Sequence, residues 1–162
     1  MHRQNQVRDY LNKAARTIVN YCIQHKIGKI VVGVNPEWKQ GIQIGKRNNQ
    51  NFVPIPYWAF RQKLAGLCER YGIAYVEQEE SYTFQASFLD QDAIPVYNAD
   101  NPQPYRFSGK RVKRGLYRSR DGRVINADVN GAANILRKIN HRLDIERMAR
   151  GFLGNPLRVK LT

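Results

Sequence analysis

One acidic residue stands at the start of a predicted helix, where it could hold a metal ion. Asn126 belongs to a residue type that caps helices well, because its side chain accepts hydrogen bonds from the free amides of the first turn. A period of 3.6 residues places Asp128 on one face with four small or apolar residues, Gly131, Ala132, Ile135 and Ile139. A carboxylate at a helix N-terminus stays ionised, and beside small side chains it can coordinate Mg²⁺. The alternative is that Asp128 only complements the helix dipole.

A second group of residues carries positive charge and could contact a polyanion. The cationic side chains cluster in one segment that also holds two aromatic rings, and the set is Lys110, Arg111, Lys113, Arg114, Arg118, Arg120 and Arg123 with Phe107 and Tyr117. Charge provides affinity for a phosphate backbone, and aromatic rings stack on unpaired bases. We expect this segment to bind nucleic acid, with Lys46 and Arg47 as the next contact. A solvated basic loop is the alternative.

Composition supports a nucleic-acid partner. The chain has 162 residues, with 27 Lys and Arg against 13 Asp and Glu, which gives a formal net charge of +14. Because 42% of the residues are hydrophobic, the chain can form a folded core, and such an excess of charge on a folded body favours a polyanion. No apolar run reaches about 18 residues and no signal peptide opens the chain, so we expect no membrane partner and a cytoplasmic location, nucleoid-associated if the source is bacterial.

The two cysteines, Cys22 and Cys68, lie in helical apolar patterns and are expected to be buried, reduced thiols. Because the sequence holds no CxxC pair, no zinc ribbon can be built, and we expect no zinc.

Hydrophobic periodicity predicts alternating helices and strands. The expected order is a helix over 6–25, a strand over 29–34, a helix over 57–70, a strand over 73–76, and the helix that carries Asp128. The first helix is expected to be amphipathic, with an apolar face of residues at helical spacing: Val7, Leu11, Ala14, Ile18 and Cys22. This is an α/β arrangement, but two strands do not make a stable parallel sheet, so the chain is expected to be the second half of a larger fold. The predicted parts are residues 1–80, a basic irregular insert at 81–123, a final helix within 124–145, and a tail at 146–162.

Four sequence blocks resemble the transposon-encoded OrfB/TnpB family of RNA-guided, RuvC-like nucleases, which are related to type V CRISPR effectors. They are residues 125–135, 44–53, 78–83 and 107–118, and together with their surroundings they follow the family over most of the chain. The resemblance implies a partial RNase H-like fold that lacks the first strands. It also implies cleavage of DNA with Mg²⁺ or Mn²⁺ in the complete protein, with DNA and a guide RNA as partners.

The chain departs from the family at the residues that carry the chemistry. The family's first catalytic Asp lies on a strand that this chain is expected to lack, and Asp9, in mid-helix, cannot replace it. The family's Glu ends the strand that corresponds to Ile30–Val34, where this chain has Gly33. In some family branches the carboxylate stands at the end of the next strand, as Glu79 and Glu80 do here.

The resemblance therefore implies that Asp128, Glu79 and Glu80 are the catalytic and metal-binding candidates. A solvated acidic strand end is the alternative for the two glutamates, and Glu37 is interpreted as a loop charge. The family's insert normally holds a four-cysteine zinc ribbon, whereas this one has Ser87 and no cysteine.

Two functions follow as hypotheses. The first is a fragment of a transposase-associated, RNA-guided DNA endonuclease with a role in recombination and transposition, catalytically incomplete alone because two-metal cleavage needs several converging carboxylates. The second is a truncated remnant that binds nucleic acid without cutting it. A basic RNA-binding protein unrelated to transposons is a third class, against which the order of the motifs argues.

Overall fold

The computed structural model describes residues 2–35, 56–140, 156 and 158–161. They form a mixed α/β chain that divides into two compact units, one of Met1–Ile30, Glu37–Val76 and Val159–Thr162, the other of Val31–Pro36 and Glu77–Arg158. The predicted loop residues Glu37, Lys46 and Arg47 lie outside the described ranges, as do most of the predicted C-terminal tail and the end expected for the last helix.

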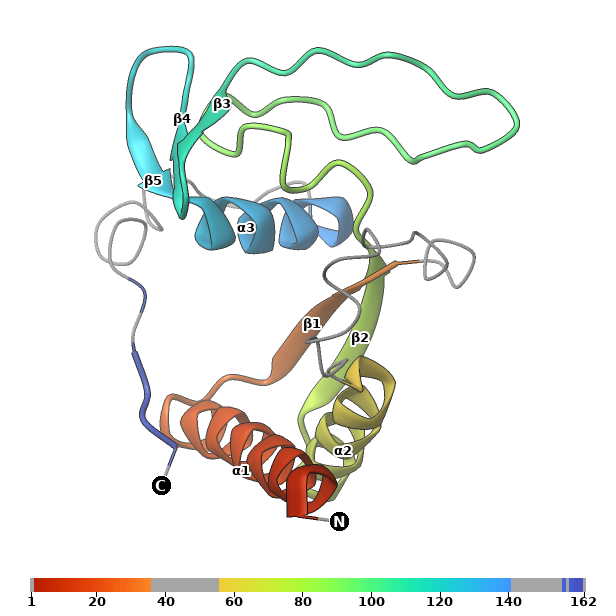
Figure 1. The fold of residues 1–162 in the computed structure, drawn as a ribbon, viewed down its shortest axis with the longest axis vertical. Coiled ribbons are helices and arrows are strands. Elements are labelled where there is room, and N and C mark those ends of the chain that lie inside the picture. Colours follow the sequence, from red (N-terminus) through yellow and green to blue (C-terminus); the bar gives the residue numbers. More distant parts are fainter. Residues whose placement is uncertain (1, 36–55, 141–155, 157, 162) are drawn as a thin grey trace. The chain divides into compact units, whose positions relative to one another are not determined.

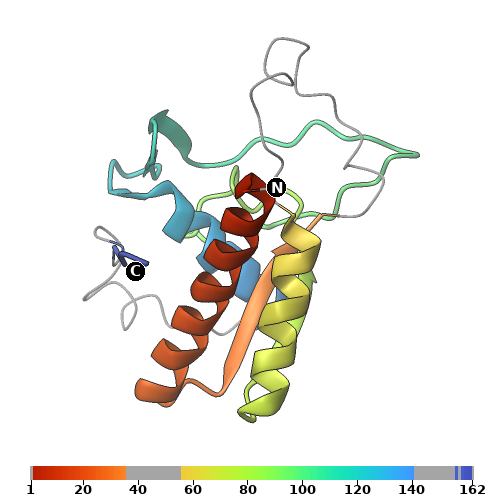
Figure 2. The same cartoon turned by 60° about the horizontal axis from the view of Figure 1, so that its bottom comes forward.

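Helices α1 (His2–Gln24) and α2 (Tyr57–Arg70) pack side by side in the first unit (Figures 1 and 2). Their contact buries Leu64 and Cys68 of α2, and one stripe of α1 formed by Leu11, Ala15, Val19 and Cys22. Ile18, which the periodicity placed inward, is 37% exposed because the buried stripe lies beside it. The prediction of buried thiols is confirmed: both cysteines are free, and burial raises the pKa of each.

Strands β1 (Lys29–Val34) and β2 (Ala74–Glu79) pair in a two-stranded sheet. The Ala74 amide donates to the Gly28 carbonyl at 2.9 Å, and the Glu80 amide donates to the Val34 carbonyl at 3.2 Å. Because the partners advance together along both strands, the pairing is parallel. β1 has the bounds that its apolar run predicted. β2 runs three residues beyond Val76, because its last positions are polar and carry no hydrophobic signal.

The second unit contains a small antiparallel sheet of β3 (Lys110–Lys113), β4 (Leu116–Arg118) and β5 (Val124–Asn126), followed directly by α3 (Ala127–Ile139; Figure 1). The prediction of a wholly irregular insert is therefore wrong for its second half. The strands are short, and most of their positions are charged and exposed, so the alternation shows only at Tyr117 and Ile125, which are buried cross-strand partners. Gly115, with φ of +81°, supports the tight turn between β3 and β4.

The core of the second unit forms where this sheet meets α3. It contains Phe88, Leu89, Tyr117, Ile125, Ala127 and Ala133. In the part of the chain that the structure describes, none of the helices has the length and apolar character needed to cross a membrane.

Candidate carboxylate site and nucleic-acid interface

Asp128 lies in the first turn of α3 and is exposed. Asn126 is the N-cap, in extended conformation, and its side-chain oxygen accepts hydrogen bonds from the amides of Asp128 at 2.9 Å and Val129 at 3.1 Å. The cap predicted from the sequence is confirmed. It fixes the start of α3 and so fixes the backbone that carries the Asp128 carboxylate.

Glu79 is held by the other end of the same helix. Lys138 Nζ lies 2.8 Å from Glu79 Oε2 and also donates to the Ser81 carbonyl at 2.8 Å, while the Ser81 amide donates to Glu79 Oε1. Burial by itself raises the pKa of Glu79, but the hydrogen bonds from Lys138 and Ser81 outweigh it, so the net pKa is lowered. Glu79 is thus an ionised carboxylate whose negative charge is balanced by Lys138.

The structure does not bring Glu79 and Asp128 together. Lys138, the partner of Glu79, lies ten residues after Asp128 on α3, which corresponds to about 15 Å along the helix axis. Paired catalytic metals lie roughly 3.5–4 Å apart, so ligands separated by this length cannot share them.

Glu80 has different surroundings. A Cβ placed on Gly33 would collide with Glu80 Oε2 and with Ile135 Cδ1, so the Glu80 carboxylate fills the space that a side chain at position 33 would take. Ile135 is seven residues after Asp128 and therefore on the same face of α3. Glu80 thus lies at the end of the parallel strands and beside α3, about two helical turns, or roughly 10 Å along the axis, from Asp128.

These residues fit part of a metal site. Carboxylate oxygens are the ligands that Mg²⁺ prefers, so the donor chemistry of Asp128 and Glu80 is suitable. However, the described residues contain no group of three or more His, Cys, Asp or Glu side chains that could hold a metal ion. Two carboxylates fall short of the set that a two-metal site needs.

The fold resembles part of Cas12f1. The match is to a chain of the cryo-EM structure of the Cas12f1–sgRNA–target DNA complex, with a TM-score of 0.51 and 15% sequence identity, over 83% of this chain and 34% of that one. This chain therefore spans about a third of the length of its structural neighbour. No family model matches the chain, and no curated protein matches it. At this identity the likeness shows the fold alone.

Four of the predicted basic residues gather on the β3–β4 hairpin. Lys110, Arg111, Lys113 and Arg118 line one concave surface of about 500 Å³ together with Val112, Leu116 and Val124. Arg114, in the hairpin turn, is also exposed. The hairpin therefore presents a compact cationic face, on which apolar side chains lie between the charges.

Two other predicted basic residues take part in contacts within the insert. Arg123 pairs with Asp121 at 2.7 Å. The Arg120 amide donates to Asp90 Oδ2 at 2.9 Å, and its guanidinium donates to Ser108 Oγ at 2.6 Å. These contacts position the insert, so Arg120 and Arg123 have a structural role beside any contact with nucleic acid.

A network of serine and aspartate side chains joins distant parts of the insert. Asp90 accepts from the Ser87 hydroxyl at 2.6 Å, and Asp92 accepts from the amides of Ser87 at 2.8 Å and Ser108 at 2.9 Å. The Arg120 amide, which follows β4, donates to Asp90 and so links the half of the insert that contains β3 and β4 to the first half. These hydrogen bonds, which include Ser87, hold the two halves of the insert together.

The prediction that Tyr117 stacks on bases is wrong. Its ring is 1% exposed in the core of the second unit, and its hydroxyl donates to the Gln85 carbonyl at 2.7 Å. Burial, then the negative charges of Asp92 and Asp90, raise the pKa of Tyr117 to about 12. A ring in this position packs against protein and cannot meet a base.

Phe107 instead belongs to an aromatic cluster that the sequence did not reveal. The Tyr82 ring lies 6.1 Å from Phe107, 5.2 Å from Tyr105 and 6.4 Å from Tyr97, between ring centroids. Tyr105 is 43% exposed, so the cluster reaches the surface. Because these rings come from separate parts of an irregular segment, spacing could not have grouped them.

Sequence analysis also missed the roles of Asn130 and Asn134. Both are fully buried on α3. The Asn130 amide group donates to the Ala86 carbonyl, and its oxygen accepts from the Phe88 amide; Asn134 donates to the carbonyls of Thr83 and Ala86. The available signal was a pair of asparagines four residues apart beside buried positions of a helix. They attach the segment after Glu80 to the helix that carries Asp128.

Proposed function

We propose that this chain is the RuvC-like part of an RNA-guided, transposon-associated DNA endonuclease of the OrfB/TnpB type, with an RNase H-like fold. The observation that carries the proposal is the place of Glu80. In the family that the chain resembles, the glutamate stands at the end of the strand that corresponds to β1, where this chain has Gly33. Here the carboxylate of Glu80, which follows β2, occupies the space beside Gly33. A carboxylate supplied from the next strand would restore the missing acid next to the helix of Asp128.

Under this proposal, Asp128 and Glu80 are the two ligands that this chain contributes to a divalent-metal site in the complete protein. Glu79 is a positioning residue, because Lys138 and Ser81 already use its oxygens. A bound Mg²⁺ would supply charge stabilisation at the phosphate under attack.

The proposed partners are DNA and a guide RNA. The structural neighbour comes from a complex with sgRNA and target DNA. In this chain the cationic face of the β3–β4 hairpin and the neighbouring aromatic cluster supply the two contacts that a strand needs, charge for its backbone and rings for its bases.

The test is Mg²⁺-dependent cleavage of DNA by the complete protein, that is, by this chain joined to a first strand that carries the family's catalytic Asp. Glu80→Gln and Asp128→Ala should each abolish cleavage and leave nucleic-acid binding largely intact, because a metal ligand acts mainly on the transition state. Glu79→Gln is the matched control, with the same chemistry one residue away, and circular dichroism checks its fold. If Glu79→Gln is inactive while folded and Glu80→Gln cuts, the assignment of the two glutamates is reversed and the proposal fails.

The second candidate is a remnant that binds nucleic acid without cutting. It is favoured by the absence of a third acidic, histidine or cysteine ligand among the described residues. A binding experiment distinguishes both candidates from a protein that does not act on nucleic acid. Replacing four hairpin residues with Ala should weaken nucleic-acid binding, and these residues are Lys110, Arg111, Lys113 and Arg114. The slope of log affinity against log salt should fall by about 0.9 for each lost contact with a duplex phosphate. Cleavage by the complete protein then separates the two candidates from each other.

A further inference from the structure

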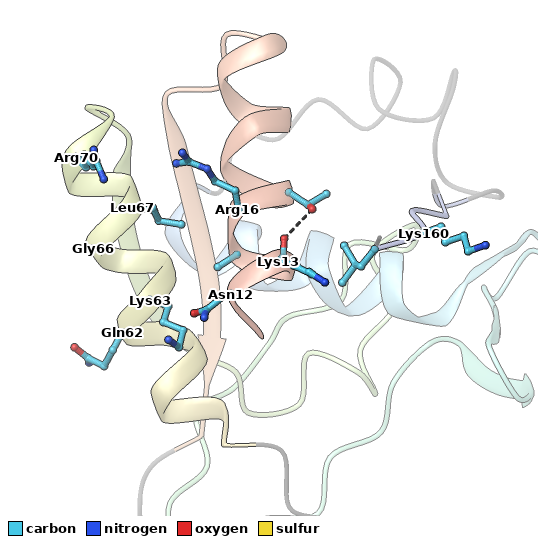
Figure 3. Close-up of a pocket in the computed structure, with 12 residues that line it drawn as sticks. Asn12, Lys13, Arg16, Gln62, Lys63, Gly66, Leu67, Arg70 and Lys160 are labelled. Carbon is cyan, nitrogen blue, oxygen red and sulfur yellow. Dashed lines mark hydrogen bonds between the residues drawn. The ribbon is translucent and has the colours of Figure 1, made fainter. Parts of the chain in front are cut away.

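Helices α1 and α2 line a second basic concavity, in the unit that holds neither Asp128 nor Glu80 (Figure 3). The groove has a volume of about 790 Å³. Its cationic residues are Lys13 and Arg16 from α1, Lys63 and Arg70 from α2, and Lys160 from the C-terminal segment. Asn12 and Gln62 add side-chain amides to the wall. A groove with this lining is suited to an anionic ligand.

One aromatic ring holds two of the guanidinium groups. Arg16 Nη1 donates to the Tyr71 hydroxyl at 2.8 Å, and the Arg16 guanidinium lies 5.2 Å from the centre of the Tyr71 ring. The Arg70 guanidinium lies 5.8 Å from the same ring. Tyr71 therefore brings together two positive charges from different helices and restricts the orientations that they can take.

Little negative charge offsets these groups. Among the described residues of this unit, the acidic side chains are Asp9, which pairs with Lys13 at 2.8 Å, and Glu69 on α2. Within the same residues, neither Arg16 nor Arg70 forms an ion pair with a carboxylate. Two neighbouring like charges repel each other, and an anion bound between them would remove this repulsion.

We propose that the groove between α1 and α2 binds the phosphate groups of a nucleic-acid backbone. Guanidinium groups bind phosphate through two parallel hydrogen bonds, and Lys63 and Lys13 add charge along the same groove. Cations from three segments line it, and its volume exceeds that of one phosphate, which favours a polymer over a single small anion. The choice of polymer rests on the proposed function, but the site lies outside the β3–β4 hairpin.

The test uses the full chain and fluorescently labelled single-stranded RNA and DNA of mixed sequence. The double variant Arg16→Gln/Arg70→Gln should bind several-fold more weakly than the parent. The slope of log affinity against log salt should fall by about 0.7 for each lost contact with a single strand, hence by up to about 1.4. Arg3→Gln/Arg8→Gln is the matched control, since it removes the same charge from exposed positions of α1 that do not line the groove.

A third variant separates charge from geometry. Arg16→Lys/Arg70→Lys keeps both charges and loses the bidentate donors, so it should keep most of the salt slope and lose affinity. Urea unfolding of each variant shows whether a change in binding reflects a change in folding, and the lysine variant keeps the test informative if the glutamine variant is unstable.

The groove is not a backbone site if the Gln variant matches the control in slope and affinity. Release of the labelled strand by inorganic phosphate alone, at concentrations where chloride of equal ionic strength has no effect, would assign the groove to a free anion and overturn the proposal. The variant with four Ala substitutions in the β3–β4 hairpin distinguishes the groove proposal from the proposed function. If the hairpin variant binds more weakly and the Arg16→Gln/Arg70→Gln variant does not, only the groove proposal fails. If neither variant changes binding, the proposed nucleic-acid function fails as well.

Discussion

Lys138 Nζ lies 2.8 Å from Glu79 Oε2, and this contact joins the last turn of α3 to the end of β2. The Lys138 side chain is 7% exposed and that of Glu79 is 25% exposed, so the pair is largely removed from water. It gives Glu79 a structural partner on α3, which is the reason for assigning the proposed metal contact to Glu80 through its position beside Gly33.

Lys138→Met should destabilise the protein by about 1–3 kcal/mol, because it leaves a half-buried carboxylate without its charged partner. Urea unfolding measures the change. Lys110→Met, which removes the same charge from an exposed strand position, should change stability by no more than about 0.5 kcal/mol. Equal effects of the two substitutions would show that the Lys138–Glu79 contact contributes nothing to stability.

Acid should unfold the protein through carboxylates whose pKa is lowered in the folded state. Burial raises the pKa of Asp92, but hydrogen bonds from Ser108 and Ser87 outweigh it and lower the net value, as for Glu79. A lowered folded-state pKa contributes stability above the unfolded-state value, near about 4, and this contribution is lost as the pH falls through the folded-state pKa. Stability should therefore be nearly constant from neutral pH to about pH 5 and decrease in more acidic solution.

Asp92→Asn tests this assignment. The variant should be less stable than the parent at neutral pH, and the difference should shrink as the pH falls below about 4, where the parent's carboxylate is protonated too. Urea titrations across the acid range measure it. Asp100→Asn, at an exposed position, serves as the control. A difference between parent and Asp92→Asn that is independent of pH would mean that Asp92 acts through packing, without a contribution from its charge.

Tyr117→Phe and Phe107→Ala should separate the buried ring from the ring at the surface cluster. Tyr117→Phe removes the hydrogen bond to Gln85 and should cost about 1 kcal/mol while leaving nucleic-acid affinity unchanged. Phe107→Ala should weaken binding to single strands by about 1–3 kcal/mol, the usual contribution of one stacked base. A loss of affinity in a stably folded Tyr117→Phe variant would contradict the burial of that ring.

The titration of Tyr117 gives an independent test. Its folded-state pKa of about 12 is raised above the ordinary value of 10, so its contribution to stability is complete below pH 10 and is lost as the pH rises towards 12. The difference in tyrosinate absorbance between parent and Tyr117→Phe should therefore develop near pH 12 or on unfolding. Its development near pH 10 in folded protein would show that the hydroxyl is accessible to solvent.

Sequence reasoning located what depends on local pattern. The apolar run of β1, the helical period of α2 and the cap at Asn126 are short-range signals, and each lies where it was expected. The predicted buried face of α1 differs from the observed one by a rotation about the helix axis. Ile18 and Val19 are both apolar, and only packing against α2 decides which of them is buried. The separation of Glu79 from Glu80 could not be foreseen, since it depends on a lysine that lies nearly sixty residues away in the sequence.

Other features were hidden by composition. The strands β3 and β4 carry so many Lys and Arg residues that one buried position, Tyr117, is all that marks β4. The same tyrosine was expected at the surface because it stands among charges. An aromatic residue flanked by exposed neighbours in a short strand is inward-facing by alternation, and this was the signal available.

Gly33→Ala should test the position of Glu80 most directly. The added Cβ would collide with Glu80 Oε2 and Ile135 Cδ1, the ends of two flexible side chains, so the Glu80 carboxylate must move aside. Because both side chains can move, the loss of stability should be at the low end for overpacking, about 1 kcal/mol, measured by urea unfolding. In the complete protein, displacement of Glu80 should also reduce Mg²⁺-dependent cleavage more than it reduces DNA binding, because the proposed metal ligand moves while the cationic hairpin does not. Gly28→Ala is the control, since a Cβ there meets open space and should leave both stability and cleavage near the parent values. A Gly33→Ala variant that is as stable and as active as Gly28→Ala would place Glu80 elsewhere and remove the observation on which the proposed function depends.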